Sequence, residues 1–335
     1  MEPIYYTELR RRSGRKLPIT LLVFDLLIIA GFFFAKTQTK PASEYVLGEE
    51  YVSPVENATS YPTLPPPSPT PSPTPSIILP SASLMQAVQS ALTESRGSYG
   101  IVVKNLKTNE NYSYNEHIKY ESASLYKLWI MAETFEQIKN GTLKETDILN
   151  GDAKTLNNIF NIASESAQLS EGTITLSVND ALNKMITISD NYAALLLGSR
   201  IRLSKVESFL KINGFRESSV GTTGNMPMTT AYDTAVFFEK LYSGKLVDQE
   251  YSNKMLQLLK AQKLNNKIPK YLAPNIVIAH KTGELDKHSH DAGIVYTQNG
   301  DYIIVILSKS DDSNSARNLI ATVSKAVFNY FQEDK

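Results

Sequence analysis

Residues 121–131 of this 335-residue chain read ESASLYKLWIM, a run with the composition of a buried helix that nevertheless contains a lysine. Lys127 follows Ser124 by three positions, so the two side chains share one face if the run is helical. A serine hydroxyl becomes a strong nucleophile only when a neighbouring base takes its proton, and lysine can do so when burial or nearby cations depress its pKa. The run therefore predicts either a nucleophile beside its base or, because such pairs also arise by chance, an ordinary core helix.

Two further motifs decide between these interpretations. The triplet SDN at 189–191 lies between two apolar runs, and KTG at 281–283 lies on a strand-like apolar run. Each triplet is expected by chance much less than once in a chain of average composition. The order S-x-x-K, SDN, KTG resembles the triple signature of the class A β-lactamases and penicillin-binding proteins. The resemblance extends over essentially all of residues 81–335.

The first two motifs supply the catalytic residues that the resemblance implies. Ser124 would attack the carbonyl carbon of an amide or β-lactam to form an acyl-enzyme, with Lys127 as proton acceptor or relay. Ser189 would pass a proton to the leaving nitrogen. Asn191 would hold Lys127 or the amide side chain of the substrate.

The third motif would bind the substrate. The resemblance implies that Lys281 and Thr282 bind a substrate carboxylate. Gly283 leaves room for close approach because it has no side chain. The backbone N–H groups of Ser124 and Glu284 would form the oxyanion hole.

The chain departs from the family pattern at two acidic positions. Class A enzymes carry a glutamate in an E-x-x-L-N context, which positions the water that hydrolyses the acyl-enzyme. The corresponding segment here is short, and its acid, Glu217, is followed by SSVG, so we expect a surface role for it. Glu165 and Glu171 precede the second motif and are poorer candidates. Without this base the acyl-enzyme should persist, and Glu284 directly after KTG should weaken the binding of anionic substrates.

The pattern of apolar residues predicts an α+β fold for residues 81–335. Strand-like runs occur near both ends, at 99–106, 111–117, 275–283, 290–297 and 301–309, and the residues between them are mainly helical. We expect one antiparallel sheet built from both ends of the domain, with the terminal helices on one face and a helical lobe on the other. The resemblance implies the same β-lactamase-like fold, a sandwich with an all-helical subdomain.

Three N-terminal segments differ from this domain in composition. Residues 1–16 are basic, and residues 17–35 form an apolar run that spans about 28 Å as a helix, close to the thickness of a bilayer. Residues 36–80 are rich in Pro, Ser and Thr, which favours an extended linker. The charges predict a cytoplasmic tail, a transmembrane anchor and an extracytoplasmic domain in the plasma membrane. A cleaved signal peptide is the rival, disfavoured because bulky phenylalanines stand where a cleavage site needs small residues.

The overall composition narrows the possible partners. The chain carries 34 basic and 34 acidic side chains, which gives no case for a nucleic-acid-binding surface. It has no cysteine and only four scattered histidines, so no spacing suggests a metal site, and we expect no cofactor. The sequence leaves the oligomeric state open.

We therefore expect a membrane-anchored serine hydrolase that opens β-lactam amides through an acyl-enzyme on Ser124. One alternative is a penicillin-binding D,D-peptidase-like enzyme, which acylates but deacylates slowly because the loop glutamate is missing. A second alternative is a non-catalytic module that binds the cell wall. The substrate class is β-lactams or the related cell-wall peptides.

Overall fold

The structure is a computed structural model that describes residues 82–93, 96–160, 162, 167–221 and 225–332. The predicted tail, anchor and linker, residues 1–80, lie outside these residues. Among the helices of the described residues, none has the length and apolar character needed to cross a bilayer.

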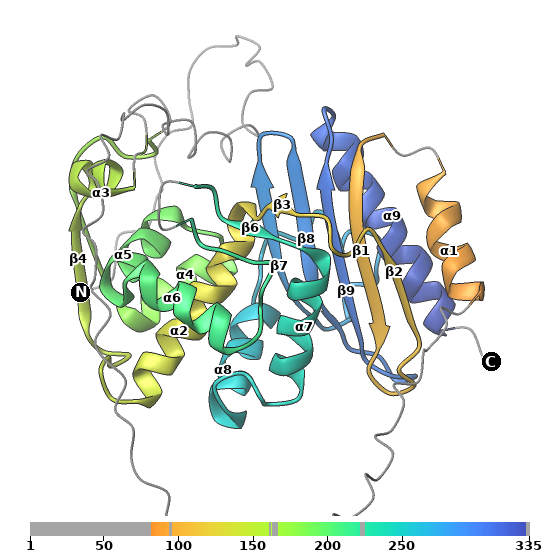
Figure 1. Ribbon diagram of the computed structural model, residues 1–335, viewed down its shortest axis with the longest axis horizontal. Coiled ribbons are helices and arrows are strands. Elements are labelled where there is room, and N and C mark those ends of the chain that lie inside the picture. Colours follow the sequence, from red (N-terminus) through yellow and green to blue (C-terminus); the bar gives the residue numbers. More distant parts are fainter. Residues whose placement is uncertain (1–81, 94–95, 161, 163–166, 222–224, 333–335) are drawn as a thin grey trace, which may run out of the picture. The chain divides into compact units, whose positions relative to one another are not determined.

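A five-stranded antiparallel sheet combines both ends of the domain, with the strand order β2-β1-β9-β8-β7 (Figure 1). Two strands come from the start of the domain, β1 (Ser98–Asn105) and β2 (Asn111–Tyr114). Three come from its end, β7 (Ile278–Leu285), β8 (His288–Val295) and β9 (Tyr302–Lys309). Strands β1 and β9 pair along their whole length, which joins the two ends. The predicted sheet is confirmed, and β7, which carries KTG, forms one of its edges.

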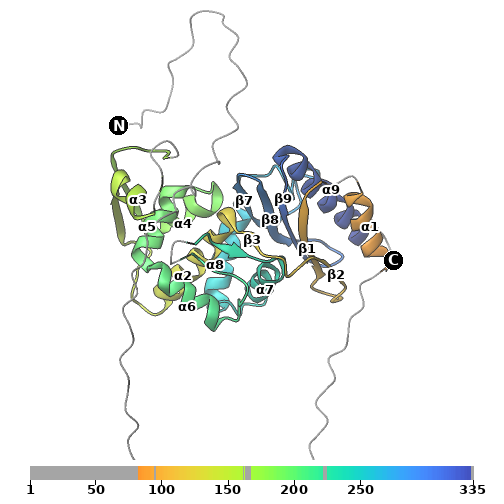
Figure 2. The same ribbon diagram turned by 45° about the horizontal axis from the view of Figure 1, so that its top comes forward.

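Helices cover both faces of the sheet (Figures 1 and 2). Helices α1 (Ala82–Leu92) and α9 (Ser313–Gln332) lie on one face, as predicted for the terminal helices. The sheet therefore has an apolar core on each face. Ile304 packs in the core under α1 and α9, and the neighbouring Ile303 packs in the core under the other helices. Strand β8 is buried at every position because both of its faces are covered.

The middle of the chain forms a mainly helical lobe. Its helices are α2 (Lys127–Lys139), α3 (Ala153–Ile159), α4 (Val178–Thr187), α5 (Asn191–Ile201), α6 (Leu203–Ile212), α7 (Ala231–Tyr242) and α8 (Gln249–Lys260). Helix α2 is buried along its first nine residues, which explains why its sequence is apolar on all sides.

Two small sheets in this lobe were not predicted. Strand β3 (Tyr120–Glu121) pairs with β6 (Met228–Thr229), and β4 (Ile148–Asp152) pairs with β5 (Thr173–Ser177). Strands β3 and β6 have two residues each, too few to show a period of two. The β3–β6 pair matters for the site, because β3 ends directly before the segment that carries Ser124.

Candidate active site

Ser124 lies in a single 3₁₀ turn, Ala123–Tyr126, which continues into α2 at Lys127. The expected helix start near Ser124 is therefore a 3₁₀ turn in front of the α-helix. Ala123 has a φ of 44°, a left-handed conformation that is uncommon outside glycine and that clusters at functional sites. Ala123 and Leu125 are buried while Ser124 between them is partly exposed, so the turn presents the serine.

Hydrogen bonds join the segment before Ser124 to β8 and to the residue that precedes β6. The backbone N–H of Ser122 donates to Pro227 O at 2.8 Å. His290 Nδ1 accepts from the backbone N–H of Ser308 at 3.1 Å, so the ring proton lies on Nε2, which donates to Glu121 O at 2.8 Å. Burial lowers the pKa of His290 to about 3, which keeps the ring neutral. A neutral histidine thus fixes the chain three residues before Ser124.

Lys127 is fully buried and points at the second motif. Its ammonium group donates to Ser189 O at 2.6 Å, to Asn191 Oδ1 at 2.7 Å and to Ser189 Oγ at 3.1 Å. The first two predicted motifs therefore meet in space, although 62 residues separate Lys127 from Ser189.

The second motif forms the junction between α4 and α5. Asp190 caps α5, since its Oδ1 accepts from the backbone N–H of Ala193 at 2.9 Å. Ser189 has a φ of 59°, again a left-handed conformation. This sharp junction directs the side chains of Ser189 and of Asn191, the first residue of α5, toward Lys127.

Lys281 reaches the same serine from β7. Its side chain is fully buried, and its Nζ lies 2.9 Å from Ser189 Oγ and 2.8 Å from Thr282 O. Ser189 Oγ thus accepts hydrogen bonds from two ammonium groups, Lys127 and Lys281. A hydroxyl oxygen has two lone pairs, so with both occupied its own hydrogen is directed elsewhere and is available to donate.

Strand β7 approaches the turn of Ser124 at Gly283. A Cβ atom on Gly283 would lie 3.2 Å from both Ala123 Cβ and Ser122 O, tighter than an ordinary contact. The space that glycine provides is therefore taken up first by the protein's own turn. Thr282 beside it is buried, with 3 % of its surface exposed, and its predicted contact with a substrate carboxylate stays a prediction.

The side chain of Glu284 is an ion-pair partner. Its Oε1 lies 2.6 Å from Lys267 Nζ and its Oε2 lies 3.5 Å from Arg317 on α9. Ser289 Oγ also donates to Oε1 at 3.0 Å. Two cations thus lie beside this carboxylate, and the expected weakening of anionic-substrate binding stays a prediction. Sequence reasoning missed Lys267, which lies in a loop with no periodicity or motif to mark it.

Glu217 is held by a separate network. It accepts from His117 Nδ1 at 3.0 Å and from Thr230 Oγ1 at 2.8 Å, and its backbone N–H donates to Asp233 Oδ2 at 2.8 Å. Partial burial would raise its pKa, but the hydrogen bonds from Thr230 and His117 outweigh that effect and hold the pKa below its usual value. These contacts agree with the expected surface role. Of the other acids considered, Glu171 is exposed and Glu165 lies outside the described residues.

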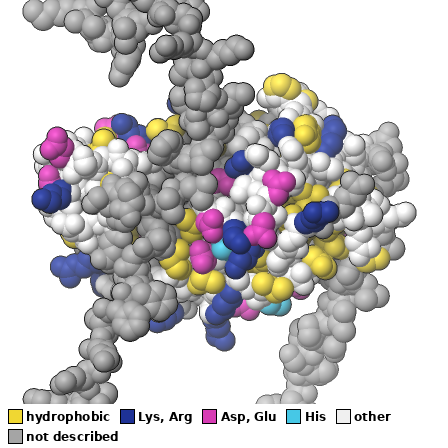
Figure 3. Space-filling model, turned by 90° about the horizontal axis from the view of Figure 1, so that it is seen from above, with side chains coloured by type: hydrophobic (Ala, Val, Ile, Leu, Met, Phe, Trp, Pro, Cys, Tyr) yellow, Lys and Arg dark blue, Asp and Glu magenta, His cyan; other side chains and the backbone are white. Residues whose placement is uncertain are grey.

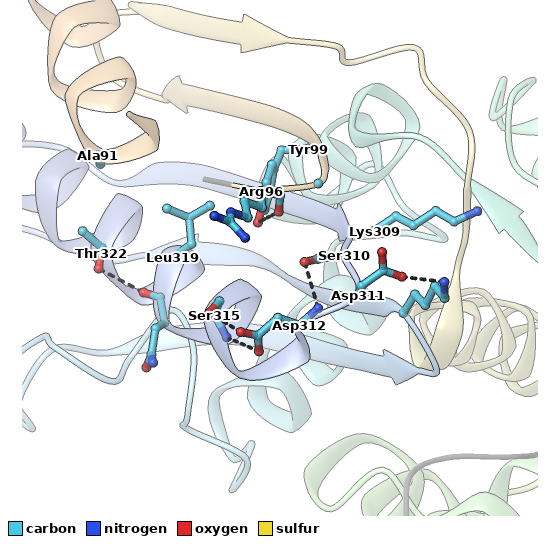
Figure 4. Close-up of a pocket in the computed structure, with 13 residues that line it drawn as sticks. Ala91, Arg96, Tyr99, Lys309, Ser310, Asp311, Asp312, Ser315, Leu319 and Thr322 are labelled. Atoms are coloured by element: carbon cyan, nitrogen blue, oxygen red, sulfur yellow. Dashed lines mark hydrogen bonds and ion pairs between the residues drawn. The ribbon is translucent and has the colours of Figure 1, made fainter. Parts of the chain in front are cut away.

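A hollow lies away from these residues, on the side of the sheet that α1 and α9 cover (Figure 4). It is lined by side chains that include Ala91, Tyr99 and Leu319, and none of the predicted site residues lines it. Its charged groups hold the local structure: Lys287 pairs with Asp311 at 2.5 Å, and Asp312 accepts from backbone N–H groups at the start of α9. On the face seen from above, basic and acidic side chains are interspersed with apolar ones, as the balanced composition leads us to expect (Figure 3).

Known structures share this fold. The β-lactamase from Sphaerobacter thermophilus superposes with a TM-score of 0.64 at 21 % identity, over 75 % of this chain and 97 % of that one. PBP-A gives 0.64 at 21 % identity, over 76 % and 97 %. The TLA-3 extended-spectrum β-lactamase gives 0.65 at 19 % identity, over 75 % and 99 %.

The sequence comparisons identify the family. No curated protein sequence matches the chain significantly. The profile of the β-lactamase enzyme family, however, matches residues 83–331, which is most of the chain and includes all three motifs. The chain therefore belongs to the β-lactamase enzyme family, and it is a serine hydrolase of that family.

Proposed function

We propose that the protein opens β-lactam amides by forming an acyl-enzyme on Ser124. One observation carries this proposal: two buried ammonium groups, Lys127 and Lys281, donate to the same oxygen, Ser189 Oγ. This arrangement leaves the Ser189 proton available for a leaving nitrogen, beside the turn that presents Ser124.

Acylation would proceed in two steps. In the first, the Lys127 ammonium gives up one proton to solvent, and the neutral amine takes the proton of Ser124 while Ser124 Oγ bonds to the carbonyl carbon of the lactam. The π electrons of the carbonyl move onto its oxygen, which the N–H groups of Ser124 and Glu284 stabilise. In the second, the carbonyl re-forms and the C–N bond breaks. The nitrogen takes the Ser189 proton, and Lys127 replaces it across 3.1 Å, so that Lys127 is neutral again.

Slow deacylation is the second candidate behaviour, and the contacts of Glu217 favour it. That acid is held by His117 and Thr230, which leaves it poorly placed to activate a water at the acyl group. One similar structure is a PBP-A mutant described as an acyl-enzyme complex with penicillin G, at 20 % identity and a TM-score of 0.63 over 75 % of this chain and 96 % of that one. An acyl-enzyme is the covalent intermediate that we propose here.

The test uses the full chain in detergent and its Ser124→Ala variant. A fluorescent penicillin followed by gel and mass spectrometry detects the adduct, and a chromogenic cephalosporin measures turnover. Steady turnover supports β-lactamase-type hydrolysis, whereas a long-lived adduct without turnover supports penicillin-binding D,D-peptidase-like behaviour. If no Ser124-dependent adduct forms with any acyl donor, the enzymatic proposal is wrong and a cell-wall-binding role is favoured.

We also propose that residues 17–35 anchor the enzyme in the plasma membrane, with the catalytic domain outside. The support is the apolar run behind a basic tail. In intact cells an added protease should cleave within residues 36–80 and release the domain, and carbonate washing should leave the uncleaved chain in the membrane pellet. Recovery of the chain in the carbonate-soluble fraction would exclude a spanning anchor.

A further inference from the structure

A second buried lysine, Lys267, contacts the strand that carries KTG. It lies in the loop between α8 and β7, and 1 % of its side chain is exposed. Its Nζ lies 2.6 Å from Glu284 Oε1, and it donates to His290 O at 3.1 Å and to Gly283 O at 3.3 Å. The Lys267 ammonium takes no part in the two acylation steps described above.

The position of Gly283 O indicates the direction of a neighbouring N–H. The carbonyl of Gly283 and the N–H of Glu284 belong to one peptide group, and no peptide bond of the described residues is cis. In a trans peptide the C=O and N–H bonds point in opposite directions. The Glu284 N–H therefore points away from the side of Lys267.

The opposite side of β7 is where Ser124 lies. Strand β7 is the edge of the sheet, and Gly283 touches the turn at Ala123 and Ser122. Lys267, by contrast, precedes Ile268, which packs in the apolar cluster of α1 and α9, and Ser324 of α9 donates to Ile268 O at 2.9 Å. The peptide group between Gly283 and Glu284 thus has a buried cation at its carbonyl oxygen, while the turn that carries the nucleophile packs against Gly283.

We infer that Lys267 is a positioning residue that orients and polarises the oxyanion-binding peptide of Glu284. A cation at an amide oxygen draws electron density through the conjugated peptide and makes its N–H a stronger donor. A donor that is already aimed at the developing oxyanion stabilises it without reorganisation. This inference rests on the proposed function, because it assigns a role in the acylation of Ser124.

Glu284 is the counter-ion of Lys267. A buried ammonium is costly unless a carboxylate lies beside it. Glu284 supplies that carboxylate, and Arg317 of α9 binds its other oxygen at 3.5 Å. The acid that follows KTG, a departure from the family pattern, is thus the counter-ion that keeps Lys267 charged beside the peptide.

The experiment compares Lys267→Met, Lys267→Arg and the double variant Lys267→Met/Glu284→Gln with the wild type, as full chains in detergent. The double variant removes both charges, so that no unpaired carboxylate is left buried if the single variant fails to fold. Lys270→Met is the matched control, since Lys270 is exposed and donates to Asn318. The acylation rate constant with a penicillin is measured on folded protein, together with the infrared stretch of the acyl-enzyme carbonyl, which rises as its hydrogen bonds weaken.

We expect acylation to fall about tenfold in Lys267→Met and in the double variant, less than the loss of a whole oxyanion donor, with a raised carbonyl frequency. Lys267→Arg should recover most of the rate, and Lys270→Met should match the wild type. If the wild type forms the adduct but the charge-free variants keep its rate and carbonyl frequency, the role of Lys267 is wrong while the proposed function stands. If the wild type forms no adduct, both are wrong.

Discussion

The two sides of strand β7 use a buried lysine in different ways. On the side of the helical lobe, Lys281 donates to the hydroxyl of Ser189 at 2.9 Å. On the side of α9, Lys267 contacts the carboxylate of Glu284 at 2.6 Å. A hydroxyl can pass on a proton when its neighbours are cations, whereas a carboxylate keeps an ammonium group charged and in place.

The two lysines are therefore expected to have different effects on the reaction rate and on the stability of the protein. The lysine that faces Ser189 should affect reaction rates more than stability, because it acts on a group that moves a proton. The ion pair between Lys267 and Glu284 should affect stability more than rates, because removing one partner leaves the other charge buried. The two sides can be tested by matched substitutions.

The largest effect is expected for Lys281→Met. Ser189 Oγ loses one of its two cationic donors, and the acylation rate constant should fall at least about 100-fold. The thermal midpoint should change little, since a methionine of similar length fills the space. Stopped-flow acylation and thermal melts measure the two quantities. A variant that acylates within a few-fold of the wild type would show that Lys281 does not act on the reaction.

The Glu284→Gln variant, which breaks the ion pair with Lys267, should lose stability more than acylation rate. Lys267 loses its counter-ion, and the free energy of unfolding should fall by about 2 kcal/mol, less than for a fully buried pair because the carboxylate is partly exposed. Acylation by the folded protein should fall far less than in Lys281→Met, since the amide oxygen can still accept from Lys267. Urea unfolding gives the stability, and a loss of acylation as large as that of Lys281→Met would erase the difference between the two sides.

The sequence predicted the main sheet and the three motifs, because regular spacing of apolar residues and characteristic residue triplets mark them in the chain. Alternation and β-branched residues marked the five strands of the sheet, and turn residues marked their connections. The three motifs marked the residues that meet at Ser189 Oγ, because their spacing in the chain resembles a known family.

Contacts formed by loops could not be predicted in this way. Lys267 reaches β7 from a loop, and its partners Glu284 and Arg317 are 17 and 50 positions further along the sequence. The hydrogen bond from His290 to Glu121 O depends on which ring nitrogen carries the proton. The backbone N–H of Ser308 on β9 determines this, because it donates to the other ring nitrogen. Such contacts follow from tertiary packing, for which a single sequence has no periodic pattern.

Acid pH should lower the stability of the folded protein through His290 of β8. The pKa of His290 is about 3 in the folded protein, because of burial, and about 6.5 in an unfolded chain. Between these values the unfolded chain binds the extra proton, so stability is fully present above pH 6.5 and falls as the pH drops, by up to about 1.4 kcal/mol per pH unit. Burial lowers the pKa of His288 as well, which adds to the same trend.

Urea unfolding at pH 7.5, 6 and 5 measures this dependence, in a range where most carboxylates stay ionised. A His290→Gln variant should lose part of the slope, because glutamine cannot take up a proton, while its amide can still donate to Glu121 O. If the wild type and this variant lose stability in parallel, the acid sensitivity has another source.

The smallest effect is expected at Glu217, the acid nearest in sequence to the missing loop glutamate. Its contacts with His117 and Thr230 are partly exposed, so Glu217→Gln should cost less than about 1 kcal/mol of stability. Glutamine still accepts from Thr230, and the decay of the acyl-enzyme, followed by mass spectrometry, should keep the wild-type rate. A decay at least about tenfold slower would instead identify Glu217 as a base for deacylation, since general bases contribute at this scale or above. It would then follow that the network around His117 and Thr230 opens when the acyl group is in place.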